Sequence, residues 1–134
     1  MKLYSFTKRV VIDTNVIVSA LLSPNGSAAK FIGDVLDEKY EVVITGSIYS
    51  EYDEVLHRSR FNIDEDIIRF ILSWMSEHAL YVEVDESDYP KDEMPDHDDA
   101  PFYVAARCTG SLLVTKNIKH YPVTEWRTMI WELL

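Results

Sequence analysis

Cysteine is almost absent from this chain, and so are the features that mark secreted or membrane proteins. The single cysteine, Cys108, excludes a disulfide framework and a thiolate zinc cluster, and it fits a reducing compartment. No apolar run reaches the roughly 18 residues that a membrane-spanning helix needs, and no signal peptide opens the chain. We therefore expect a cytoplasmic protein without a membrane segment.

Basic residues are also scarce. The chain has 13 Lys and Arg against 23 Asp and Glu, which gives a formal net charge of −10 at pH 7. This balance excludes nucleic-acid binding through bulk charge alone. It leaves room for a metal-centred site, because clustered carboxylates repel one another unless a cation neutralises them.

The length and the apolar content predict one globular domain. The 134 residues are enough for one core but too few for two, so a single domain is expected over residues 1–134. Apolar residues make up 47% of the chain, which excludes intrinsic disorder. The composition shifts strongly only over residues 83–99, an expected loop with nine acids and one lysine.

Short β-branched runs alternate with segments of helical periodicity. The runs predict strands at residues 9–12, 41–45, 80–84 and 112–115, with a short strand near residues 128–131. Apolar spacing predicts helices over residues 16–21, 28–36, 48–56 and 67–75. A further helix is expected to open at residues 98–101 and to end before Gly110. This alternation predicts an α/β fold with a mostly parallel central sheet and helices on both faces.

Polar side chains follow several of the predicted strands. Asp13 comes directly after the first strand, residues 47–51 follow the second, and residues 115–117 end the strand that begins at residue 112. Asp98 and Asp99 open the helix before that strand. Ligands bind outside the carboxyl ends of such strands, so these side chains are expected at one edge of the sheet. Oxygen ligands from several elements suit Mg²⁺ or Mn²⁺.

Helical geometry selects among neighbouring acids. Glu51 lies three residues after Ile48 and so borders the buried stripe of its helix. Asp99 precedes Phe102 by three residues, which places it on the inward face, whereas Asp98 is better placed as a helix cap. A carboxylate beside a core needs a partner, and a metal ion is one candidate.

Four segments carry the candidate residues in order along the chain. They are Val-Val-Ile-Asp13-Thr14-Asn15-Val-Ile-Val-Ser19-Ala, Glu51-Tyr-Asp-Glu-Val-Leu, Asp96-His-Asp98-Asp99-Ala-Pro-Phe102 and Leu-Leu-Val-Thr115-Lys-Asn117-Ile-Lys-His-Tyr-Pro. Together these segments resemble the PIN-domain ribonucleases, and most of all their branch of VapC-like toxins of type II toxin–antitoxin pairs. The resemblance extends from Arg9 to about Pro122. It implies a PIN-like fold and a Mg²⁺- or Mn²⁺-dependent endoribonuclease that uses one or two ions.

The resemblance also implies roles for individual residues. Asp13, Glu51 and Asp99 match the three central acids of the family, which are catalytic and bind the metal. Asn117 stands where many members have a fourth acid, and it is a weaker ligand because its amide is neutral. Asp96 and Asp98, close to Asp99, are candidates for the missing charge. Asn15 and Thr115 match polar positions that support the metal in the family.

Partners follow from the same resemblance. An RNA substrate needs cations near the acids, and the candidates for phosphate contacts are Lys116, Lys119, His120 and Arg107. The acidic surface suits the basic tail of an antitoxin. A homodimer is expected because Phe70 and Trp74 widen the apolar stripe of the helix over residues 67–75, although core packing remains open for both aromatic side chains.

Other interpretations of the same residues compete with these expectations. Taken singly, Asp13 can be a helix cap, Glu51 a solvated helix residue and Asn117 a turn residue. A receiver-type phosphoacceptor is disfavoured, because no clear helix follows Asp85 after the expected middle strand. A haloacid-dehalogenase-like phosphatase needs a second Asp two residues after the first, where this chain has Asn15. The remaining rival is a non-catalytic binding or scaffold module of the same fold, favoured by Asn117 and the charge of −10.

Overall fold

A parallel sheet forms the centre of the molecule. The computed structural model describes residues 8–85, 99–121, 124, 126–129 and 133. Within these ranges, five strands form one sheet in the order β3-β2-β1-β4-β5, and every pairing is parallel. The strands are β1 (Lys8–Ile12), β2 (Tyr40–Ile44), β3 (Leu80–Tyr81), β4 (Leu112–Thr115) and β5 (Arg127–Met129). The predicted α/β class is confirmed.

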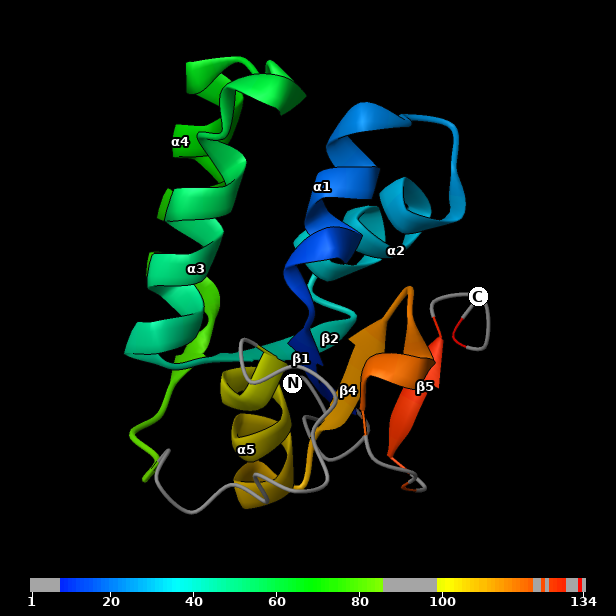
Figure 1. Cartoon of the computed structure of the whole chain (residues 1–134), viewed down its shortest axis with the longest axis vertical. Coiled ribbons are helices and arrows are strands. Elements are labelled where there is room, and N and C mark those ends of the chain that lie inside the picture. Colours follow the sequence, from blue (N-terminus) through cyan, green and yellow to red (C-terminus); the bar gives the residue numbers. More distant parts are fainter. Residues whose placement is uncertain (1–7, 86–98, 122–123, 125, 130–132, 134) are drawn as a thin grey trace.

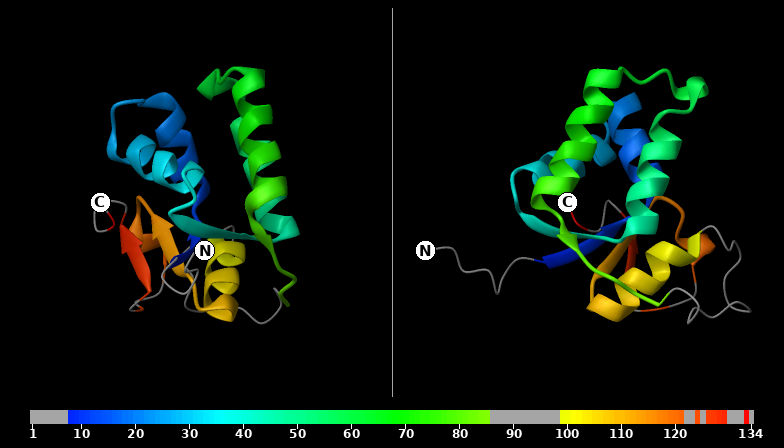
Figure 2. Two further views of the ribbon diagram at one scale, coloured as in Figure 1. Left: turned by 180° about the vertical axis from the view of Figure 1, so that it is seen from behind. Right: turned by 90° about the vertical axis from the view of Figure 1, so that its left-hand side faces the viewer.

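Helices lie on both faces of this sheet. They are α1 (Thr14–Leu22), α2 (Ser27–Leu36), α3 (Gly46–Leu56), α4 (Glu65–His78) and α5 (Ala100–Thr109), with short 3₁₀ turns η2 (Ser59–Phe61) and η5 (Ile118–His120). Helix α5 packs on the face opposite α1 and α2, and the α3–α4 hairpin stands beside α1 and α2 (Figures 1 and 2). No helix in the described ranges is long and apolar enough to span a membrane.

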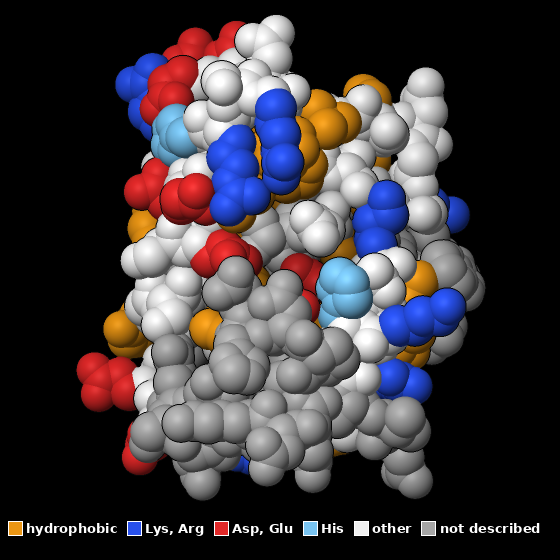
Figure 3. Space-filling view, viewed as in Figure 1, with side chains coloured by type: hydrophobic (Ala, Val, Ile, Leu, Met, Phe, Trp, Pro, Cys, Tyr) orange, Lys and Arg blue, Asp and Glu red, His pale blue; other side chains and the backbone are white. Residues whose placement is uncertain are grey.

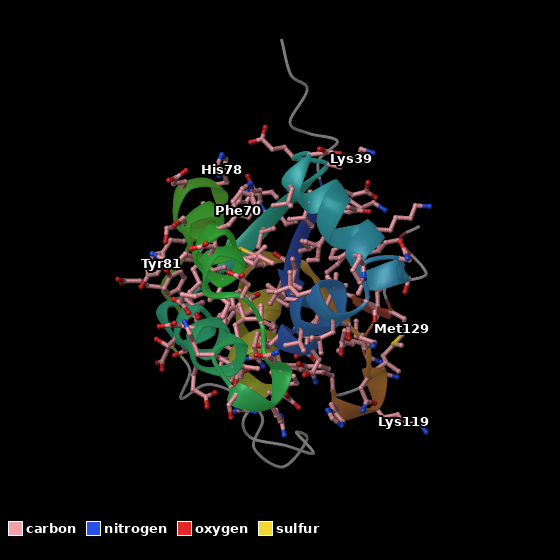
Figure 4. All side chains as sticks on the ribbon, turned by 90° about the horizontal axis from the view of Figure 1, so that it is seen from above. Lys39, Phe70, His78, Tyr81, Lys119 and Met129 are labelled. Carbon is pink, nitrogen blue, oxygen red and sulfur yellow. The ribbon has the colours of Figure 1, made fainter. Side chains whose placement is uncertain are left out.

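The central strands are buried on both faces. Val10, Val11 and Ile12 of β1 are fully buried, as are Leu113 and Val114 of β4. This burial explains why their sequences are continuous apolar runs rather than alternating patterns. The edges of the sheet lie far apart, and Figure 4 shows Tyr81 of β3 and Met129 of β5 on opposite sides of the molecule.

The order of the strands creates a switch point between β1 and β4. The chain passes from β1 to β2 and β3 on one side, then crosses by α5 to β4 and β5 on the other. Ile12 pairs with Val114, and the backbone N–H of Asp13 donates to the Val114 carbonyl at 2.9 Å. Connections leave in opposite directions here, which opens the sheet edge to ligands.

Two predicted strands differ from the structure in their bounds. The strand predicted for residues 80–84 pairs only over Leu80–Tyr81, although Val82 still donates to the Ile44 carbonyl at 3.0 Å. The segment from Val82 to Val84 then leaves the sheet and helps to line a cavity of about 360 Å³ with residues 45–47. The strand predicted near residues 128–131 is observed as Arg127–Met129. Asp96, Asp98 and most of the predicted acidic loop lie outside the described residues.

Replacement by alanine should have opposite effects on the free energy of unfolding at two glycines. Gly33 lies within α2, and a Cβ there meets nothing within 4 Å, so Gly33→Ala should raise the free energy of unfolding by about 0.5–1 kcal/mol. Gly110 ends α5 with φ of 65°, in the left-handed region. Gly110→Ala should therefore lower it by roughly 1 kcal/mol. Urea unfolding measures both variants, and stabilisation by both would contradict the expected role of Gly110.

Candidate functional site

Asp13 is the buried centre of the candidate site. It directly follows β1, and only 4% of its surface is exposed. Its Oδ2 accepts hydrogen bonds from Thr115 Oγ1 at 2.9 Å and from Tyr121 Oη at 3.1 Å. Burial raises the pKa of Asp13 above its ordinary value of 3.8, and the two hydroxyl groups oppose this effect because they stabilise the carboxylate. The acid is thus held in one orientation by neighbours from β4 and η5.

Helix capping does not account for the buried carboxylate. Asp13 occupies the N-cap position of α1, but its side chain makes no capping hydrogen bond. The backbone N–H of Asn15 still acts to lower the pKa of Asp13, although its geometry falls short of a cap. The interpretation of Asp13 as a simple helix cap is therefore wrong for its side chain.

Glu51 reaches the same region from α3. It lies on the helix face bordered by the buried residues Ile48 and Val55, and it is half-buried. Thr14, the first residue of α1, donates its hydroxyl to Glu51 Oε2 at 2.9 Å. This bond ties the acid of α3 to the residue that follows Asp13.

Asp99 approaches from α5. It occupies the N-cap position without a capping hydrogen bond from its side chain, and that side chain is 16% exposed. Its Oδ2 lies 3.5 Å from Nδ1 of His120 in η5. The same histidine acts on Asp13, whose pKa it lowers through its charge.

Tyr121 is influenced by all three acids. Burial raises the pKa of its phenol far above the usual range, and the charges of Asp13, Asp99 and Glu51 raise it further. Of the three, Asp13 is in direct contact with its hydroxyl. Beneath them, the hydroxyl of Tyr52 donates to the carbonyl of Ile12 at 2.5 Å and supports the end of β1.

The strand β5 supports Tyr121 from the edge of the sheet. The guanidinium of Arg127 donates to the carbonyl of Ile118 at 2.9 Å and to that of Tyr121 at 2.8 Å. These bonds hold η5 and the residue after it against the sheet. The position of the Tyr121 hydroxyl therefore depends on the pairing of β4 with β5.

The donor set fits a hard divalent cation. Asp13, Glu51 and Asp99 offer carboxylate oxygens, which are the ligands that Mg²⁺ and Mn²⁺ prefer. In the described part of the chain, no group of three or more His, Cys, Asp or Glu side chains is assembled closely enough to hold an ion. The three acids therefore come from elements at the same edge of the sheet without forming a closed cluster in the described residues.

The predicted supporting residues Thr115, Asn117 and Asn15 differ in their contacts with the acids and in their exposure. Thr115 bonds Asp13 and also accepts the backbone N–H of Asn117 at 3.0 Å. The side chain of Asn117 is exposed and lies 2.9 Å from Nε2 of His120. Asn15 is exposed as well. Asn117 is therefore linked to the site through Thr115 and His120.

Basic side chains lie around these acids. Figure 3 shows acidic side chains beside a histidine near the centre of one face, with Lys and Arg side chains around them. Lys116 precedes η5 and Lys119 lies within it, and both are exposed. Lys116 donates to Ser19 Oγ at 2.7 Å. Arg107 lies in the last turn of α5, about 12 Å along the helix axis from Asp99, and packs over the Tyr103 ring.

Three site residues were missed by sequence reasoning. Tyr121 bonds Asp13, Thr14 bonds Glu51, and Tyr52 supports the end of β1. Thr14 is adjacent to Asp13 in sequence, and this proximity was an available signal. No spacing rule links Tyr121 to a residue 108 positions away.

Acids at the switch point of a parallel sheet make this an acid-centred α/β domain. The sequence profile described as PIN domain matches residues 9–119, and the chain belongs to the PIN domain family. PIN domains are generally nucleases and typically use divalent metal ions. A comparison with curated proteins gave no match.

Asp13→Asn should raise the free energy of unfolding at neutral pH, because it removes a buried charge. The folded state holds the Asp13 proton more tightly than the unfolded chain does. The protonated Asp13 side chain therefore makes its full contribution to the free energy of unfolding below the ordinary pKa of 3.8. This contribution is lost as the pH rises through the raised pKa. Urea unfolding of both proteins from acidic to neutral pH measures the difference. A variant less stable than the wild type at neutral pH would contradict this electrostatic account.

Proposed function

We propose that the protein is a Mg²⁺- or Mn²⁺-dependent endoribonuclease and the toxin of a type II toxin–antitoxin pair. The observation that carries this proposal is that hydrogen bonds and an ion pair link Asp13, Glu51 and Asp99 to the residues at one edge of the sheet in a PIN domain. Each acid comes from a different element, so the fold rather than local sequence gathers them. Nothing in a structural core requires such mutually repelling groups.

Each acid has its own proposed role in metal binding. Asp13 and Asp99 are the proposed ligands of one ion, and Glu51 would hold a second ion or an outer-shell water. A bound divalent ion supplies an activated water and stabilises negative charge on the scissile phosphate. Thr115 and Tyr121 keep one oxygen of Asp13 occupied by hydrogen bonds, which leaves the direction of the carboxylate fixed. These two residues are positioning residues.

Substrate contacts are proposed for the cations beside η5. Lys116 and Lys119 carry no carboxylate partner within the described ranges, and His120 lies next to Asp99. Phosphate groups of RNA are their natural counter-ions. Because the whole chain carries a charge of −10, binding should be modest and strongly dependent on salt.

RNA cleavage by the purified protein is the direct test. We expect cleavage with Mn²⁺ or Mg²⁺ and none with EDTA. Asp13→Ala and Asp99→Asn should lose more activity than Tyr121→Phe and Thr115→Val, for which the loss of an outer-shell partner predicts a decrease of roughly 10- to 100-fold. Glu51→Gln is compared with Glu77→Gln, which changes an exposed acid on α4 and should leave the rate unchanged.

Metal binding is measured separately from activity. Mn²⁺ should raise the melting temperature of the wild type more than that of Asp13→Asn, because ligand binding to the folded state stabilises it. Metal binding without cleavage of structured and unstructured RNAs at low salt would contradict the nuclease proposal. That result would favour a non-catalytic binding or scaffold module, for which the neutral Asn117 is the supporting feature.

A cytoplasmic homodimer and an antitoxin with a basic tail complete the proposal. The charge of −10 complements a basic segment. Helix α4 supplies an apolar face for a second copy, because Ile67 and Phe70 are 45% and 55% exposed, and the half-buried Trp74 lies beside them. A neighbouring gene for a small DNA-binding protein with a basic tail would support the toxin role independently of nuclease activity.

Phe70→Glu should convert the dimer to a monomer, because it places a charge in the apolar contact. Ser76→Glu is the matched control, since Ser76 is exposed on another side of the same helix. Light scattering after size-exclusion chromatography gives the mass of each variant. A monomeric wild type, or a dimer that persists in Phe70→Glu, would place the interface elsewhere or remove it.

A further inference from the structure

Arg60 and Phe61 form a stacked pair in η2, at the turn between α3 and α4. The guanidinium carbon of Arg60 lies over the Phe61 ring, 4.8 Å from its centroid. Phe61 is half-buried and packs against the hydrophobic core, whereas Arg60 is exposed. The ring therefore lies on one side of the guanidinium, while the Arg60 side chain remains open to solvent.

Arg60 differs from the neighbouring arginines in its ion pairing within the described residues. Arg58 pairs with Glu54 at 2.8 Å, and Arg69 pairs with Asp66 at 2.9 Å. Arg60 has no carboxylate partner among the residues that the structure describes. In a chain with an excess of ten acids, an arginine that lies over an aromatic ring and has no acid partner among the described residues is available to an external anion.

The pair lies beyond Glu51 along the α3–α4 hairpin. Leu56, the last residue of α3, follows Glu51 by five residues, or roughly 7.5 Å along the helix axis, and η2 begins three residues later at Ser59. Figure 1 places η2 at the end of the hairpin that is distant from α5. Figure 3 shows basic side chains next to hydrophobic ones at this end of the face that also carries the central acids.

We propose that Arg60 and Phe61 form a stacking platform for one base of single-stranded RNA, a few nucleotides from the cleaved phosphate. The base stacks on the outer face of the guanidinium, which adds a third layer to the existing pair. Proteins bind unpaired bases by stacking them on aromatic rings and on arginine planes. The inference rests on the proposed ribonuclease function, and it adds a preference for unpaired substrate.

The chemistry of the pair favours RNA over a protein partner. A basic peptide, such as an antitoxin tail, is repelled by the unpaired guanidinium. An apolar surface would bury the charge without a counter-ion, which is costly. A single-stranded nucleic acid offers both a π-face for stacking and phosphates for the charge.

Binding is tested in EDTA, where the proposed cleavage does not occur. The probe is a short fluorescent single-stranded oligoribonucleotide, and fluorescence anisotropy gives its affinity. Arg60→Gln should weaken binding roughly tenfold through the lost stacking layer. It should also reduce the slope of log affinity against log salt by about 0.7, as expected for one phosphate contact. Lys30→Gln removes one exposed charge from α2 as the matched control and should have little effect.

Two further variants separate stacking from charge and from folding. Arg60→Lys keeps the charge, so it should retain the salt slope and still lose affinity. Phe61→Leu keeps an apolar side chain in the half-buried position and removes the ring. An oligonucleotide with abasic sites should bind the wild type about tenfold more weakly, and Arg60→Gln should no longer distinguish it from the normal probe.

The outcomes distinguish this proposal from the ribonuclease proposal. RNA binding that is weakened by Arg60→Gln, in a protein that never cleaves RNA with Mn²⁺, would support the platform and contradict the nuclease function. Cleavage and binding that are unchanged in Arg60→Gln and Phe61→Leu would overturn the platform alone. A wild type that binds duplex as tightly as single-stranded RNA, or binds neither, would also overturn it.

Discussion

The burial of one carboxylate at the end of a central strand is the constraint on which the site depends. Asp13 loses most of its hydration, and its pKa rises because two hydroxyl groups replace water only in part. The surrounding structure supplies what the strand itself lacks, with Thr115 from β4 and Tyr121 from the segment after η5. A charge that is held in the core at a cost in stability is typical of positions kept for function rather than for stability.

The strand order converts this local arrangement into a shared site. Because β1 and β4 are neighbours while their helices leave in different directions, the first residues beyond both strands meet. Glu51 and Asp99 then join from α3 and α5. The basic residues around this edge offset locally the net charge of the chain, so a protein with an excess of acids still presents cations on the face of its candidate site.

Sequence reasoning predicted the features that depend on local patterns. Apolar runs gave the buried strands β1, β2 and β4, and Asp13 and Thr115 could be placed because they end such runs. The strand β3 was predicted too long, because the apolar residues Val82 and Val84 leave the sheet and line a cavity instead. The role of Tyr121 could not be predicted, since its hydroxyl reaches Asp13 only through the packing of η5 and β5. Asp96 and Asp98 stay predictions, and so do the metal-binding roles.

The distance along the chain between Asp13 and its partners also determines when the site can exist. Tyr121 and Thr115 lie 108 and 102 residues from Asp13, and Arg127 in an edge strand secures Tyr121 in turn. Contacts of such long range form only when the entropy of closing most of the chain has been overcome. The arrangement around Asp13 therefore belongs to the cooperative folded state and to no fragment of it. A partly folded chain carries the same acids without the geometry that brings them together, so loss of the site should coincide with global unfolding.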